Sequence, residues 1–191
     1  SATGEPIYVT EDGAGDRDGS SWGNAMGVKE LRQALVSGDQ GEYWLAKGTY
    51  KPADVTDDNP CGKSFVLSDG IALYGGFQGW ETKRSQRDSM TNKTTLSGAI
   101  SDDLGSYHVV YAKDVNKTAV LDGFTITGGN AASAYISTYN YRVGGAIGLA
   151  SSEGVVSNCV FYGNKAGVRG GAVSGLNALY GHVYDCVFYS N

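Results

Sequence analysis

The stretch "NCVFYGN" at residues 158–164 returns almost unchanged as "DCVFYSN" at residues 185–191. The two copies are 27 residues apart, measured from Cys159 to Cys186. A period in the twenties, with a few short strands in each unit, is typical of a β-solenoid, in which each unit forms one coil of backbone. Parallel pairing between coils would place each residue about 4.8 Å from its equivalent in the next coil. The repeat therefore predicts a stack of parallel strands.

Equivalent residues of the two copies should lie on one another in three pairs, namely Cys159 on Cys186, Phe161 on Phe188 and Asn164 on Asn191. The cysteine and phenylalanine pairs would lie inside, and the asparagine pair would form an amide ladder at a corner. Val160 and Tyr162 would point outward, because side chains alternate along a strand. We expect the two cysteines to be free thiols, since parallel Cβ vectors place the sulfur atoms in poor geometry for a disulfide.

An earlier copy of the repeat, "DGFTITGGN" at residues 122–130, marks a longer coil. When Phe124 is matched to Cys159, the spacing is 35 residues, which is eight more than the repeat spacing of 27 residues. The surplus falls in "AASAYISTYNYR" at residues 131–142, which is rich in tyrosine. Aromatic rings with polar edges suit sugar rings, so we take this segment as a ligand-binding platform. Its candidate residues are Tyr135, Tyr139, Tyr141 and Arg142, with Trp80 as a second candidate elsewhere. The alternative is that these tyrosines only cover the flank of the stack.

One amphipathic helix is predicted near the N-terminus, over residues 24–36. Its apolar positions recur at helical spacing, Asn24 is a plausible N-cap and Gly38 a plausible stop. The apolar face would cover the first coil as a cap. Nearly all of the chain after it consists of short strand patterns separated by glycine, asparagine or aspartate. We predict one all-β domain over residues 1–191, with a strand, a loop and the capping helix in residues 1–40 and the coils in residues 41–191.

The last strand pattern ends at Asn191 with nothing comparable to a cap. Such an end would expose backbone hydrogen-bonding groups and apolar side chains. We expect a chain truncated at this end first, and self-association through the open coil second.

Composition argues against several classes of partner. The net charge is −5 and no basic run is present, which disfavours nucleic acid and anionic membrane surfaces. The apolar stretches are too short for a membrane-spanning helix. The three cysteines and two histidines show no metal-ligand spacing, so the histidines are taken as structural or surface residues. Three aspartates in the first loop could bind Ca²⁺, although their spacing is not that of an EF-hand and a solvated turn is the alternative; they are Asp12, Asp16 and Asp18. No other cofactor is expected.

Several motifs resemble bacterial right-handed parallel β-helix proteins of the pectate-lyase-like superfamily. They are "DGSSWGNA", "YWLAKGTYKP", "SFVLSDGIALYGGFQGWET" and "LDGFTITGGNA" in the N-terminal part, and the "GGAI" and "CVFYGN" units, which are similar to the repeats of polymorphic outer-membrane proteins. The resemblance covers most of the chain. It implies a right-handed parallel β-helix in an exported bacterial protein, secreted or held at the cell surface. Its motifs are glycines, core residues and corner asparagines, none of which is a catalytic group.

Three functional hypotheses follow. The first is a non-catalytic, adhesin-like surface protein that displays loops toward glycans or host-cell components. The second is a polysaccharide lyase or glycoside hydrolase, which would need carboxylates placed together at one sugar. No such set is visible, and the pair Arg84 and Arg87 is interpreted as a solvated turn with Glu81 and Asp88 as charge partners. The third is an assembly module that stacks through its open end.

Overall fold

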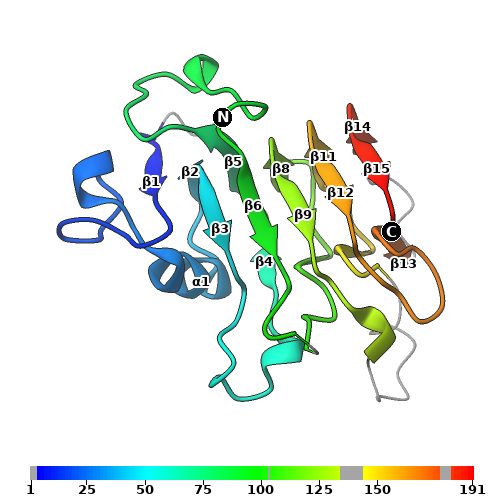
Figure 1. Cartoon of the computed structure of the whole chain (residues 1–191). Coiled ribbons are helices and arrows are strands. Elements are labelled where there is room, and N and C mark those ends of the chain that lie inside the picture. The colour runs from blue at the N-terminus through cyan, green and yellow to red at the C-terminus, as the bar shows by residue number, and fades with distance from the viewer. Residues whose placement is uncertain (1–3, 103, 134–143, 177–181) are drawn as a thin grey trace.

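Three parallel β-sheets and one α-helix form the described part of the chain, as the computed structural model shows (Figure 1). The structure describes residues 4–102, 104–133, 144–176 and 182–191. The six-stranded sheet contains, in spatial order, β1 (Ile7–Val9), β2 (Gly41–Ala46), β5 (Ile71–Phe77), β8 (Val120–Asp122), β11 (Val155–Ser157) and β14 (His182–Tyr184). The four-stranded sheet contains β4 (Phe65–Leu67), β7 (Val110–Lys113), β10 (Ile147–Ala150) and β13 (Val173–Leu176). The five-stranded sheet contains β3 (Gly48–Tyr50), β6 (Thr94–Ser97), β9 (Thr125–Thr127), β12 (Val160–Tyr162) and β15 (Val187–Tyr189).

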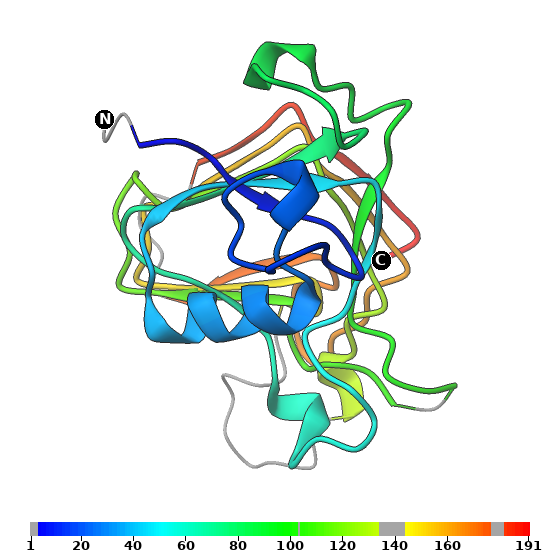
Figure 2. The same ribbon diagram turned by 90° about the vertical axis from the view of Figure 1, so that its left-hand side faces the viewer.

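The chain visits these sheets in a fixed cyclic order. From β2 onward it passes through the six-stranded, the five-stranded and the four-stranded sheet in turn, and then begins again. Each inner strand pairs in parallel with the strands of the preceding and following passages. Viewed from the N-terminal end, successive passages lie behind one another (Figure 2). The predicted parallel stack is therefore confirmed.

The register of the two repeat copies agrees with the repeat spacing of 27 residues. Phe161 pairs with Phe188 across β12 and β15, and their rings stack at 4.7 Å between centroids. On the other side Phe161 pairs with Ile126 of the earlier copy. At the corner, Asn164 Nδ2 donates to Asn191 Oδ1 at 2.9 Å, so the expected amide ladder is present. Both repeat cysteines are free thiols, as predicted.

One hydrophobic core runs along the inside of all three sheets. In the six-stranded sheet, Leu73, Leu121 and Val156 lie in register and are buried. Phe161 is fully buried in the five-stranded sheet, and Ile147 is fully buried in the four-stranded sheet. Burial of a side chain of this size stabilises the fold by about 1.5–3 kcal/mol relative to exposure. The alternation of buried and exposed positions also decides which side chains face outward and can form a site.

The helix begins later than the sequence predicts. α1 extends over Val28–Ser37, whereas Asn24 lies in the 3-10 helix η1 (Trp22–Asn24) and is not its N-cap. Residues 25–27 are extended because Met26 bridges to Val9 and Gly27 to Asp12, and these tertiary pairings override local helix propensity. The predicted stop is confirmed: Gly38 ends the helix with a left-handed φ of 75°.

The apolar face of α1 packs into the core at the N-terminal end of the stack. Leu31, Ala34 and Leu35 are buried. The helix lies beside β4, the first strand of the four-stranded sheet, and thus covers that edge (Figure 2).

Candidate binding site

A small pocket lies on the outer face of the four-stranded sheet, at the N-terminal ends of β4 and β7. Its volume is about 160 Å³. The residues that line it are Gly62, Ser64, Val66, Tyr107, His108 and Tyr111. Gly62 ends the 3-10 helix η2 (Pro60–Gly62), and the other residues come from β4, β7 and the residues just before these two strands. Two neighbouring passages of the chain therefore build the pocket together.

Strand alternation places the two rings at the centre of the pocket. Val110 and Ala112 are fully buried in the core, so Tyr111 between them faces outward. In the next passage Tyr111 pairs with Gly148 of β10. A Cβ atom at Gly148 would lie 3.1 Å from Tyr111 Cδ2 and 3.3 Å from His108 Cγ. The glycine thus leaves the space that the two rings occupy.

Hydrogen bonds fix the imidazole and the neighbouring loop. His108 Nδ1 lies 2.8 Å from the carbonyl oxygen of Gly144, and because a carbonyl only accepts, Nδ1 carries the proton. In the neutral ring Nε2 is then the unprotonated nitrogen. The His108 and Tyr111 rings stack with centroids 5.7 Å apart. The Ser64 hydroxyl donates to the carbonyl oxygen of His108 at 2.7 Å, which joins the beginning of β4 to that of β7.

The second tyrosine is held by the backbone of η2. The Tyr107 amide donates to the carbonyl oxygen of Cys61 at 2.8 Å. Burial, together with the nearby Cys61, raises the pKa of the Tyr107 phenol. Tyr107 is therefore a neutral phenol at physiological pH, which can donate and accept hydrogen bonds.

The chemistry of this pocket is that of a small polar ligand with an apolar face. Two phenol rings provide flat surfaces and Ser64 provides a hydroxyl group, while His108 is itself buried. None of the described lining residues is a carboxylic acid. The pocket is therefore suited to hold a sugar ring by stacking and hydrogen bonding. The lining residues that the structure describes include no acid–base pair for glycoside hydrolysis.

The platform predicted from the surplus segment falls on Tyr135, Tyr139, Tyr141 and Arg142, and these four residues lie outside the described residues. Gly144 follows closely in the sequence and is described. Its carbonyl oxygen accepts the hydrogen bond from His108. The first described residue after that segment, Gly144, therefore contacts the histidine of the pocket. From the sequence, His108 was interpreted as a structural or surface residue and was not connected with a site.

Trp80, the second candidate, is displayed on a different part of the surface. Trp80 is 61% exposed. The adjacent Glu81 is buried, and its carboxylate accepts backbone N–H groups of Gln78 at 2.6 Å, Gly79 at 3.0 Å and Trp80 at 3.0 Å. Burial raises the pKa of Glu81, but these hydrogen bonds outweigh it and the net pKa is lowered. The ionised side chain therefore holds the turn that presents Trp80.

The turn at Trp80 and the tyrosine pocket do not form one site. Residues 78–93, which contain η3 (Arg84–Gln86), extend from one side of the molecule, and η2 lies on the opposite side in both ribbon views (Figures 1 and 2).

The three aspartates of the first loop are not brought into a metal site. Asp12 lies in a bridge with Gly27, and the Asp18 carboxylate accepts the backbone N–H of Ser20 at 2.8 Å. Hydrogen bonds from Ser20 lower the pKa of Asp18. Within the described ranges, no group of three or more His, Cys, Asp or Glu side chains could hold a metal ion.

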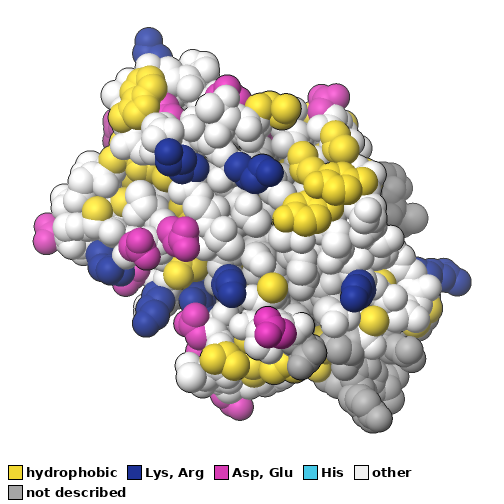
Figure 3. All heavy atoms as spheres, in the orientation of Figure 1, with side chains coloured by type: hydrophobic (Ala, Val, Ile, Leu, Met, Phe, Trp, Pro, Cys, Tyr) yellow, Lys and Arg dark blue, Asp and Glu magenta, His cyan; other side chains and the backbone are white. Residues whose placement is uncertain are grey.

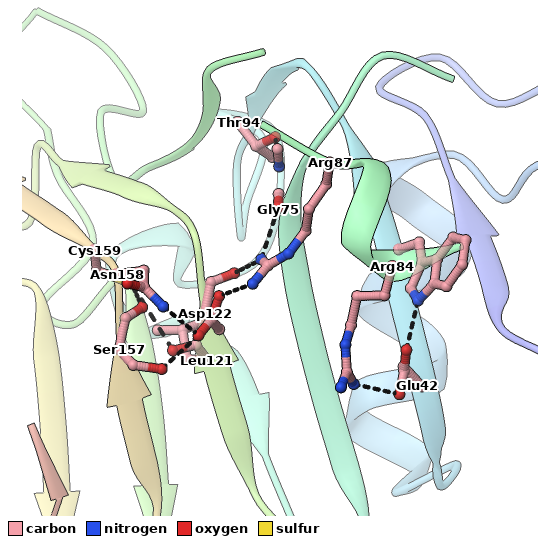
Figure 4. Close-up of polar contacts among 12 residues, drawn as sticks. Glu42, Gly75, Arg84, Arg87, Thr94, Leu121, Asp122, Ser157, Asn158 and Cys159 are labelled. Atoms are coloured by element: carbon pink, nitrogen blue, oxygen red, sulfur yellow. Dashed lines mark hydrogen bonds and ion pairs between the residues drawn. The ribbon is translucent and has the colours of Figure 1, made fainter. Parts of the chain in front are cut away.

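A largely buried ion pair lies on the outer face of the six-stranded sheet (Figure 4). Arg87 pairs with Asp122, and its Nη1 also donates to the carbonyl oxygen of Gly75 at 3.0 Å. The other carboxylate oxygen of Asp122 accepts from the Ser157 hydroxyl and from Asn158 Nδ2 at 2.8 Å. Burial alone would raise the pKa of Asp122. The hydrogen bonds from Ser157, Arg87 and Asn158 lower this pKa by more than burial raises it, so the net pKa is lowered. Asp122 is thus a fully bonded anion at neutral pH.

The prediction that Glu81 and Asp88 are the charge partners of the two arginines is wrong. Arg84 pairs with Glu42 at 2.9 Å, and Arg87 pairs with Asp122. Both guanidinium groups lie over the ring of Tyr74, at 4.4 and 5.1 Å from its centroid. The segment is therefore fastened across three strands and is more than a solvated turn. We refer to Arg87, Asp122, Ser157 and Asn158 as the Asp122 cluster.

Comparisons with known proteins add no family to this description. No protein-family model matches the sequence, and searches of curated proteins and of solved structures found no match. Among the described elements, no helix has the length and apolar character needed to cross a bilayer. The functional conclusion therefore depends on the geometry of the residues themselves.

Proposed function

We propose that this protein is a non-catalytic carbohydrate-binding protein, and that the pocket formed by Tyr107, His108 and Tyr111 binds a sugar ring. The observation that carries the proposal is a pocket of about 160 Å³ on the outer face of a sheet, where the rings of Tyr111 and His108 stack beside Gly148. Aromatic faces of this kind contact the C–H surface of a sugar, while phenol and hydroxyl groups bond its hydroxyls.

We further propose that the body of the protein is a right-handed parallel β-helix. The cyclic order of the three sheets and the parallel register between passages support this architecture. The sequence resemblance to exported bacterial surface proteins supports a secreted or cell-surface location. In this setting the ligand would be a glycan of a cell surface or of an extracellular polysaccharide, and the protein would act as an adhesin-like module.

Binding to an oligosaccharide panel tests the proposal. The wild-type protein is titrated with neutral and acidic oligosaccharides by calorimetry or by ligand-observed NMR. We expect Tyr111→Ala to weaken binding by about tenfold or more, which corresponds to the roughly 1.4 kcal/mol of one lost stacking contact. Tyr162→Ala is the matched control, because Tyr162 also faces outward from a strand but belongs to the five-stranded sheet. Absence of binding to every sugar, or equal affinity of Tyr111→Ala and the wild type, contradicts the proposal.

Two additional measurements separate the alternatives. Tyr139→Ala tests the platform predicted from the surplus segment independently of the pocket. Assays for reducing ends and for unsaturated products on a polysaccharide panel test the alternative of a polysaccharide lyase or glycoside hydrolase. Product formation by the wild type would show that the non-catalytic part of the proposal is wrong, even if sugar binding is confirmed.

A further inference from the structure

Trp80 differs from the other two tryptophans of the chain in how its indole ring is used. Trp44 is buried and Trp22 is half-buried. The indole N–H of Trp44 donates to Glu42 Oε1 at 2.7 Å. The indole N–H of Trp22 donates to the carbonyl oxygen of Glu81 at 2.9 Å. Trp80 is largely exposed, and none of the hydrogen bonds between described residues uses its indole N–H. Two tryptophans therefore serve the fold, whereas the third presents a ring and a donor to solvent.

The turn that carries Trp80 is fixed by hydrogen bonds at several points. The carboxylate of Glu81, which is buried, accepts the backbone N–H groups of residues 78–80. The carbonyl oxygen of the same glutamate accepts the Trp22 indole N–H, which ties the turn to η1. A backbone that is already ordered loses little conformational freedom when its side chain binds a ligand. The turn is therefore preorganised for a contact at Trp80.

The surroundings of Trp80 indicate the size of its ligand. At the top of the molecule, where residues 78–93 lie, hydrophobic side chains are separated by polar and charged ones (Figure 3). Gln78 and Lys83, which are close to Trp80 in the sequence, are exposed. A stable protein interface buries about 800 Å² of each partner around an apolar core, which an isolated ring does not supply. One aromatic ring with amide and ammonium groups nearby suits a single sugar residue.

The turn and the tyrosine pocket face different directions. The segment 78–93 extends from one side of the molecule, and η2, which borders the pocket, lies on the opposite side in both ribbon views (Figures 1 and 2). A sugar residue at Trp80 and a sugar residue in the pocket therefore cannot be neighbours in one glycan chain. Two sites in this arrangement engage two chains, or distant parts of one long chain.

We propose that Trp80 is the centre of a second sugar-binding site, and that the protein uses the two sites to bridge glycan chains. The ring of Trp80 would stack on the C–H face of a sugar, and its indole N–H would donate to a hydroxyl group. The bridging rests on the function proposed for the pocket, whereas the contact at Trp80 does not. Each site alone would bind weakly, but two sites that engage a surface with many copies of one sugar reach a much higher apparent affinity.

Fluorine NMR of protein labelled with fluorotryptophan tests the contact directly. The three tryptophans give separate resonances, and Trp80→Phe identifies the resonance of Trp80. The probes are oligosaccharides of cellulose, of chitin and of polygalacturonate. We expect at least one of them to shift the Trp80 resonance in a saturable way, and the shift to persist in Tyr111→Ala. Met90→Ala is the matched control, because Met90 is an exposed apolar residue of the same segment and its removal should leave the shift unchanged.

Agglutination measures the bridging. Beads are coated with the oligosaccharide that shifts the Trp80 resonance, and the lowest concentration of protein that agglutinates them is determined. We expect wild-type protein to agglutinate the beads. Trp80→Ala and Tyr111→Ala should each raise the required concentration by about tenfold or more, because each variant keeps only one of the two sites. Met90→Ala should agglutinate as the wild type does.

The outcomes separate the second site from the function proposed for the pocket. If no probe shifts the Trp80 resonance, the second site is overturned even when Tyr111→Ala shows that the pocket binds sugar. If Trp80→Ala agglutinates beads as well as the wild type, the bridging is overturned. A shift at Trp80 combined with unchanged binding and agglutination by Tyr111→Ala supports the Trp80 contact, but it contradicts the proposed function of the pocket and overturns the bridging between these two sites.

Discussion

The outer faces of two sheets carry clusters of different chemistry, a charged one around Asp122 and an aromatic one around Tyr111. On the six-stranded sheet, the carboxylate of Asp122 is bonded to Arg87, Ser157 and Asn158, and its side chain is only 10% exposed. On the four-stranded sheet, His108 and Tyr111 line an open pocket of about 160 Å³ beside a glycine. The carboxylate oxygens of the first cluster are bonded within the protein, whereas the second lines the pocket that we propose for a sugar.

Under the proposed function, charged residues are a poor guide to the binding site in this chain. A buried anion with three donors stabilises the attachment of residues 78–93 to the sheet, but its lone pairs are already used. Aromatic rings over a glycine leave a surface that a sugar can use. The two clusters should therefore respond to substitution in opposite ways: the Asp122 cluster in stability and the pocket in binding.

The largest expected effect is the loss of stability in Asp122→Ala. The substitution leaves the Arg87 guanidinium, whose side chain is 19% exposed, without its carboxylate partner. Removing one partner of a buried pair costs about 3–5 kcal/mol of unfolding free energy. Chemical denaturation measures this loss, and sugar binding should be unchanged in the folded protein. A loss below about 1 kcal/mol would assign the pair to the weak class of exposed ion pairs and contradict the comparison.

Acid should remove part of the same stabilisation. The folded pKa of Asp122 is lowered, so its contribution is fully present above the unfolded value of about 3.9 and is lost as pH falls through the lower folded pKa. The Asp122→Asn variant cannot titrate at this position. The stability difference between the wild type and Asp122→Asn should therefore shrink between neutral pH and pH 3, as measured by denaturation at each pH. A difference that stays constant over this range would show that the charge of Asp122 contributes nothing.

The architecture could be predicted from sequence because stacking makes distant contacts periodic. The 27-residue spacing from Cys159 to Cys186 predicted that Phe161 pairs with Phe188, and the structure confirms this register. The predicted beginning of the helix was wrong because the bridges from Met26 to Val9 and from Gly27 to Asp12 are tertiary contacts, which leave no local signal in the sequence.

The pocket could not be predicted from the same repeat spacing. Val66 and Tyr111 are in register between β4 and β7, but the coils there differ in length and share no repeated motif. The available signal was an outward-facing tyrosine on one strand opposite a glycine on the next. Likewise, the partner of Arg87 lies 35 residues away at Asp122, whereas sequence analysis assigned charges to local neighbours.

A methyl group at Gly148 should affect binding more than stability. In Gly148→Ala the new Cβ would lie 3.1 Å from Tyr111 Cδ2 and 3.3 Å from His108 Cγ, so both rings must shift by a few tenths of an ångström. We expect sugar affinity to fall several-fold, while the unfolding free energy changes by less than about 1 kcal/mol, because alanine also reduces the entropy of the unfolded chain. Gly154→Ala is the control, since its Cβ would meet its neighbours at 3.4 Å or more. Equal affinities of the two variants would place the ligand elsewhere.

The smallest effect is expected for Arg84→Ala, and it sharpens the comparison within one face. Arg84 and Arg87 lie over the same Tyr74 ring, but the Arg84 side chain is 47% exposed and its partner Glu42 is 34% exposed. Solvent and salt screen such a pair, which is worth about 0–1 kcal/mol. Denaturation of Arg84→Ala at low and high salt should show a small loss that decreases further with salt. A loss as large as that of Asp122→Ala would mean that the whole outer face, including its exposed arginine, acts as one structural network, and burial would no longer separate the cluster that stabilises the fold from side chains available to a ligand.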